Sequence, residues 1–125
     1  MEYEFTIEGR LPSLNDYVWA NRAHWSKGAN YKKTVEAGIV WQIKAAVNKG
    51  TLRPVTGKVE LVIDWHESDQ RRDVDNIVSA KKFILDAMQS AGIIPNDNRK
   101  WVSNIHDNII DDTRDYVRVL LREVA

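Results

Sequence analysis

The chain has 125 residues, contains no cysteine, and balances 18 lysines and arginines against 18 aspartates and glutamates. Its length fits a single domain over residues 1–125, large enough to bury a hydrophobic core without disulfides. The lack of cysteine excludes a disulfide scaffold, a cysteine-ligated metal and a thiol nucleophile, and the zero net charge is not typical of a general nucleic-acid-binding protein.

The first half of the chain predicts a strand, a long loop and a helix. Residues 3–7 alternate between apolar and polar side chains, which indicates a half-buried strand. Residues 11–30 contain Pro12, Ser13, Asn15, Asn21, Gly28 and Asn30, and we expect a loop there, of a length that is commonly functional. Apolar residues recur every four positions across Tyr31–Lys49, which predicts a helix that Gly50 ends. The recurring residues are Val35, Ile39, Ile43 and Val47.

The second half predicts a strand, a second helix and two further strands. Alternation over Val59–His66 indicates a strand, and an apolar stripe over Asp75–Ala91 predicts a helix that Gly92 ends. Trp101–Ile110 is a weaker strand candidate, whereas Tyr116–Val124 alternates clearly. The predicted order is β-α-β-α-β-β. This order favours one α+β domain in which two helices pack on a small mixed or antiparallel sheet.

Four of the tryptophans fall into two groups. Trp41 and Trp65 lie on apolar periodic faces, and we expect both in the core. Trp19 and Trp25 flank Arg22 in the predicted loop, which suits either contacts with phosphates and unstacked bases or packing in the core.

Nothing in the sequence indicates a membrane protein. No segment approaches the ~20 apolar residues of a membrane helix. The opening residues, MEYEFTIEGR, are acidic and alternating, unlike a signal peptide. We expect a cytoplasmic protein without membrane association.

Positive charge is concentrated in the first half of the chain. Seven basic residues and one acid lie between Ala20 and Arg53, against ten basic and thirteen acidic residues from Gly57 to the end. One segment is therefore suited to phosphates and another to a cation, although a well-mixed solvated surface is the alternative. The predicted phosphate contacts in the basic segment are Arg22, Lys27, Lys32 and Lys33.

Asp73 and Asp75 are the strongest candidates for chemistry. In an extended segment both side chains point to one side, where the carboxylates repel unless a cation lies between them or one stays protonated. Mg²⁺ prefers such oxygen ligands. The alternative is that Asp75 caps the following helix while Asp73 is a solvated loop residue. Lys82 lies about two turns beyond Asp75 on one predicted helix face, and Asp97 follows the helix in a turn.

Motifs near the start, centre and end of the chain together resemble a known family. They comprise Leu11–Asn15, then Asp73, Asp75, Asn76, Asp86, Gly92 and Asp97, and finally a strand that contains Arg118. In this order they resemble the motifs of the RusA-type Holliday junction resolvases. The similarity covers nearly the whole chain and is far more specific than the aspartate pair alone.

The resemblance implies a RusA-like fold and an Mg²⁺-dependent endonuclease. Such an enzyme resolves four-way (Holliday) junctions by paired nicks as a homodimer, in recombination, repair or phage DNA processing. The resemblance maps the catalytic and metal-binding aspartates onto Asp73, Asp75 and Asp97. It maps the functional lysine onto Lys82, with Lys81 as the alternative. It also implies an intracellular protein, associated with the nucleoid or encoded by a phage.

The remaining polar residues allow two interpretations. Arg71 and Arg72 either bind the scissile strand or balance charge, and Asn15 and Asn76 either contact DNA or cap local structure. The three histidines are scattered, and we expect none to be a metal ligand.

Two other functions stay open from the sequence. The first is a non-catalytic protein of the same fold that binds branched DNA. The second is a different Mg²⁺ enzyme such as a nucleotidyl transferase. The latter would need a nucleotide-binding loop, and the chain has no G-x-x-x-x-G-K-[ST] motif, so we expect no nucleotide cofactor.

Overall fold

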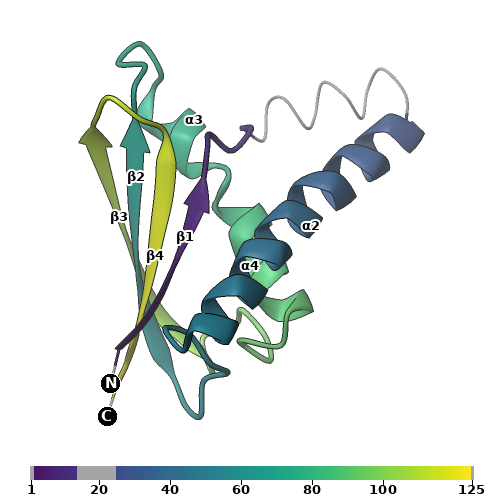
Figure 1. The fold of residues 1–125 in the computed structure, drawn as a ribbon, viewed down its shortest axis with the longest axis vertical. Helices are drawn as coiled ribbons and strands as arrows, with labels where there is room; N and C mark the ends of the chain where they lie inside the picture. Colours follow the sequence, from purple (N-terminus) through teal and green to yellow (C-terminus); the bar gives the residue numbers. More distant parts are fainter. Residues whose placement is uncertain (1, 14–24, 125) are drawn as a thin grey trace.

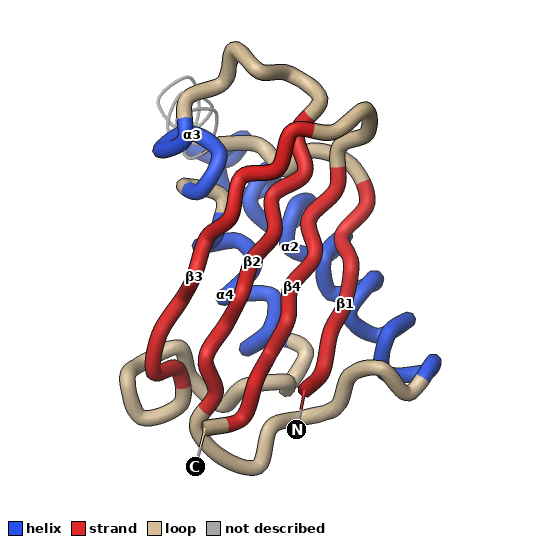
Figure 2. The backbone as a smooth tube through the Cα atoms, turned by 90° about the vertical axis from the view of Figure 1, so that its left-hand side faces the viewer, coloured by secondary structure: helices blue, strands red, loops and turns tan. Residues whose placement is uncertain are grey.

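The chain forms one sheet with helices on one face (Figures 1 and 2). The structure is a computed structural model that describes residues 2–13 and 25–124, the side chains of 25–29 excepted. The elements are β1 (Glu2–Glu8), α2 (Trp25–Lys49), β2 (Val59–Glu67), α3 (Val74–Val78), α4 (Lys81–Ser90), β3 (Val102–Asp111) and β4 (Tyr116–Glu123). The predicted α+β class with a small mixed sheet is confirmed. None of the described helices is long and apolar enough to cross a membrane.

The sheet order is β1-β4-β2-β3. Strand β4 runs antiparallel to both β1 and β2, whereas β2 and β3 are parallel. Parallel neighbours need a crossover connection, and α3 and α4 supply it. In Figure 1, α3 lies beside the end of β2, and the segment after α4 lies toward the opposite end of the sheet.

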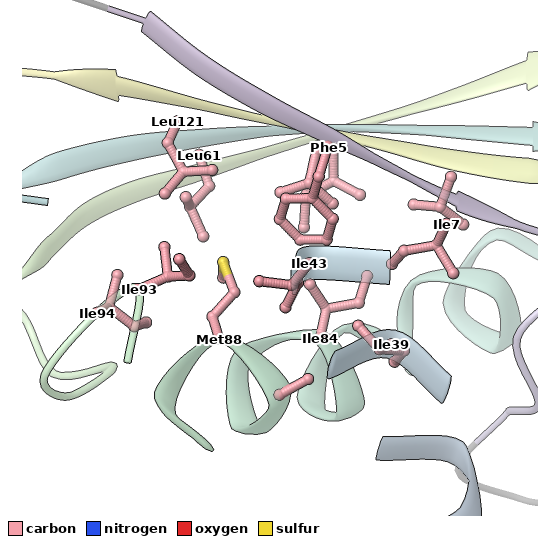
Figure 3. Packing of buried hydrophobic residues seen from close by; sticks show 14 of the residues in the cluster. Phe5, Ile7, Ile39, Ile43, Leu61, Ile84, Met88, Ile93, Ile94 and Leu121 are labelled. Carbon is pink, nitrogen blue, oxygen red and sulfur yellow. The ribbon is translucent and has the colours of Figure 1, made fainter. Parts of the chain in front are cut away.

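The core lies between the sheet and the helices (Figure 3). Alternate strand residues face the helical layer, as strand geometry requires, and Trp65 among them is 1% exposed, as predicted. Both longer helices contribute side chains to this layer. The labelled core residues are Phe5, Ile7, Ile39, Ile43, Leu61, Ile84, Met88, Ile93, Ile94 and Leu121.

Helix α2 begins earlier than the sequence predicts, at Trp25 rather than Tyr31. Gly28 and Asn30, which we interpreted as part of a loop, lie inside it. Each costs a helix only about 1 kcal/mol or less, and a long helix propagates through such residues. Of the remaining predicted loop, residues 14–24 lie outside the described residues.

The prediction that Trp41 belongs to the core is wrong, because its side chain is 75% exposed. The buried stripe runs from Ile39 and Ile43 to Ala46, while Val47 is 38% exposed. A helix has about 3.6 residues per turn, so residues at a strict four-residue spacing rotate gradually away from the core, as Val47 does. Trp41 follows Ile39 by two residues, roughly 200° around the helix, and therefore faces outward.

None of the described helices covers the other face of the sheet (Figure 2). Its charges pair across strands. Arg118 contacts Glu4 and reaches Asp64 at 3.7 Å. Arg122 lies 2.9 Å from Glu2, and a second contact of 3.0 Å joins it to Glu60. Four of the chain's acids are thus paired with arginines on this face.

We expect Ile43→Ala to destabilise the fold by about 2–5 kcal/mol, because it leaves a cavity between α2 and the sheet. Urea denaturation measures this loss, and the slope of the free energy of unfolding against urea concentration should not change. Val47→Ala is the control, since it removes an exposed side chain from the same helix and should change stability by about 0.5 kcal/mol or less. Equal losses in both variants would contradict this packing.

Candidate functional site

The loop that leaves β2 is tied down by side-chain contacts. Glu67 is 4% exposed, and its carboxylate accepts a 2.8 Å hydrogen bond from Arg72. The backbone N–H and hydroxyl of Ser68 donate to Asp115 at 2.7 and 2.9 Å. Hydrogen bonds from the Arg71 side chain and backbone lower the pKa of Asp69 to about 2. These contacts fix the conformation of the loop between β2 and α3.

Asp73 and Asp75 lie at the start of α3. Asp73 is the N-cap, with extended backbone angles and no side-chain capping bond, and Asp75 belongs to the first turn. The alternative in which Asp75 is the cap is therefore wrong. So is the extended geometry assumed for the pair, because the backbone turns helical at Val74. Both aspartates are exposed, and the dipole of the helix start favours their negative charge.

The single helix predicted over Asp75–Ala91 is two helices. Its break lies at Ser79, whose hydroxyl donates a 2.7 Å hydrogen bond to the carbonyl of Asn76. A serine hydroxyl that bonds to the preceding turn bends a helix. The next amide, that of Ala80, bonds to the carbonyl three residues back rather than four. The prediction that Asp75 and Lys82 share one helix face is therefore wrong.

Lys82 contacts two carboxylates instead. Its ammonium lies 3.1 Å from Asp86 and 3.4 Å from Asp97. The hydrogen bond to Asp86 is the largest cause that raises the pKa of Lys82. The structure thus brings together two predicted site residues, Lys82 and Asp97, although the sequence did not indicate their contact.

Lys81 belongs to a separate arrangement that sequence reasoning missed. Its ammonium lies 2.5 Å from Oδ2 of Asp107 on β3. The other carboxylate oxygen of Asp107 accepts a 2.9 Å hydrogen bond from Nε1 of Trp65. A charged residue on the helix-facing side of a strand is the signal that could have revealed this group. The weak alternation of β3 concealed it.

The acids predicted to bind a metal do not gather within one chain. Among the described residues, no group of three or more Asp, Glu, His or Cys side chains could hold an ion. Asp73 and Asp75 lie at the start of α3, whereas Asp97 follows α4 and contacts Lys82. Two exposed carboxylates nevertheless suit Mg²⁺, which is commonly held by one or two carboxylates together with water and substrate phosphate.

The predicted DNA contacts occupy varied positions. Lys32 is paired with Asp86 at 3.3 Å and Arg72 with the buried Glu67, whereas Arg71 is paired with Asp69 but 90% exposed. Lys33 is exposed on α2, and Asn76 lies in the first turn of α3. Asn15, Arg22 and the side chain of Lys27 lie outside the described residues.

Comparison with models of protein families gave no match, and comparison with curated proteins gave none either.

Proposed function

We propose that this protein is an Mg²⁺-dependent endonuclease that nicks branched DNA, with the four-way junction as its substrate class. The observation that carries the proposal is the exposed pair Asp73 and Asp75 at the start of α3. The loop that leads to this pair is held in place by side-chain contacts. The motif resemblance described above supports the same activity. Such an enzyme would work in the cytoplasm, in recombination, repair or phage DNA processing.

The chemistry requires an activated water, a neutralised phosphate and an orientated strand. Asp73 and Asp75 would hold Mg²⁺, whose contribution when bound is to polarise the phosphate and lower the pKa of the attacking water. Lys82 would add positive charge where the transition state becomes more negative. Its contact with Asp97 keeps the ammonium close to a further predicted ligand.

A homodimer accounts for the separation of Asp97 from the pair. Within one chain Asp97 contacts Lys82, and among the described residues the three acids form no group that could hold an ion. A two-fold axis brings the end of one crossover beside the start of the other in an antiparallel arrangement. Each site would then combine Asp73 and Asp75 of one subunit with the partner subunit's Asp97. Two such sites match two symmetric nicks.

We expect Asp73→Asn, Asp75→Asn and Asp97→Asn each to abolish cleavage of a labelled four-way junction while leaving junction binding largely intact, because an amide keeps the shape but loses the charge. Gel assays with Mg²⁺ and with EDTA measure cleavage. Asp64→Asn, on the uncovered sheet face, is the matched control and should cut normally. Cleavage without Mg²⁺, or by any of the three variants at the normal rate, would contradict the assignment. Binding without cleavage by the unaltered protein would favour the non-catalytic alternative.

Lys82→Ala should lower kcat more than it weakens binding, because a charge that acts on the transition state affects the chemical step. Lys81→Ala should instead lower stability by about 1–2 kcal/mol, since it removes an ion-pair partner from the half-buried Asp107. Cleavage kinetics and thermal unfolding on both variants separate the two roles. A larger loss of kcat in Lys81→Ala would make Lys81 the functional lysine.

Shared sites predict complementation between inactive variants. A mixture of Asp75→Asn and Asp97→Asn proteins should regain single nicks after subunit exchange, because one site of the mixed dimer has all three acids. The control mixture, Asp73→Asn with Asp75→Asn, should stay inactive, because both of its sites lack an acid. If exchange is demonstrated and the first mixture also stays inactive, the sites are not shared.

A further inference from the structure

A large aromatic ring is exposed on the outward face of α2. The side chain of Trp41 is 75% exposed. It borders a shallow hollow of about 330 Å³ on the surface of this helix. The residues that line the hollow are Lys33, Glu36, Ala37, Val40, Trp41 and Lys44.

Helical spacing aligns this surface. Lys33, Ala37, Val40 and Lys44 recur at intervals of four, three and four residues, which places them in one stripe. Lys33, Ala37 and Lys44 are exposed, whereas Val40 packs partly against the core. Trp41, beside the centre of the stripe, is exposed on the outward side. Eleven steps of about 1.5 Å separate the two lysines by roughly 16 Å, enough to span several nucleotides of one strand.

The charge of the stripe is positive. The one acid that lines the hollow, Glu36, is directed toward α4, where its carboxylate accepts a 2.5 Å hydrogen bond from the hydroxyl of Ser90. Within residues 2–13 and 25–124, no carboxylate oxygen lies within 4.0 Å of the ammonium of Lys33 or Lys44. The neighbouring Lys32 differs, because it is paired with Asp86. The stripe therefore presents an indole ring between two ammonium groups.

We propose that Trp41 stacks on an unpaired base of a DNA strand while Lys33 and Lys44 contact phosphates on either side. The inference rests on the proposed function for its partner, DNA, and adds which part of branched DNA this helix contacts. An aromatic ring within a basic groove is the usual combination for single-stranded nucleic acid. A paired base inside a duplex does not offer its face to such a ring.

Charge disfavours a second copy of the chain as the occupant of this surface. A symmetric dimer formed through this stripe would place the same surface against itself, so the lysines of both copies would lie close together. Like charges in contact oppose association. A polyanion with exposed base faces satisfies both the ring and the ammonium groups.

The test is binding of fluorescein-labelled oligo(dT) of about 15 nucleotides, followed by anisotropy in EDTA so that no cleavage occurs. Trp41→Ala should weaken binding by about 5- to 150-fold, the effect typical of losing one stacking aromatic. Trp41→Phe should keep most of the affinity, and Trp41→Leu should not, because only a ring can stack. Thermal unfolding confirms that each variant is folded.

The lysines are tested by the salt dependence of the same binding. Lys33→Gln with Lys44→Gln should reduce the log–log salt slope by about 1.4, or about 0.7 for each lost contact with a single strand. Lys58→Gln with Lys100→Gln is the matched control, outside α2, and should leave the slope unchanged.

Several results would overturn the inference. Unchanged affinity in Trp41→Ala would do so, as would equal losses in Trp41→Phe and Trp41→Leu. If Trp41→Ala no longer self-associates but binds oligo(dT) normally, the surface is a contact with a second copy of the chain. If the protein cleaves the junction but its affinity for oligo(dT) does not depend on Trp41, this inference alone is refuted. Binding through Trp41 without Mg²⁺-dependent cleavage refutes the proposed nuclease alone.

Discussion

Strands β2 and β3 run parallel side by side, so the chain that leaves β2 must travel back along the sheet before β3 can begin. Helices α3 and α4 make this return, and the candidate site follows from it. Asp73 and Asp75 lie where the crossover starts, and Asp97 lies where it ends. Asp97 contacts Lys82 in the first turn of α4, but among the described residues the three acids form no group that could hold an ion.

The break at Ser79 sets how the two adjacent lysines are used. A continuous helix would extend along the axis of α3, whereas the break allows α4 to pack on the core with a separate axis. Consecutive residues on a helix point about 100° apart. Lys81 therefore reaches Asp107 on the edge strand, while Lys82 reaches Asp86 and Asp97. One lysine joins the helix to the sheet, and the other lies beside a residue of the proposed site.

The sheet was predictable from the sequence because burial on one face imposes alternation, and β1, β2 and β4 alternate clearly. Features that depend on weak local energies were less predictable. Gly28 does not stop α2, because a cost of about 1 kcal/mol is small beside the packing of a long helix. Ser79 does interrupt a helix, although serine is common in helices. The Asp107 contacts depend on side chains distant in sequence, and no local pattern records them.

The balanced charge of the chain conceals an uneven surface. Two arginines on the uncovered sheet face pair with four acids of neighbouring strands. In the stripe on α2, Lys33 and Lys44 are exposed and have no carboxylate partner among the described residues. Asp73 and Asp75 are exposed at the start of the crossover. A phosphodiester substrate needs both kinds of surface, one to hold its phosphates and one to hold a cation against the bond that breaks. Net charge cannot reveal this arrangement, because it depends on which charges the fold pairs and which it leaves exposed.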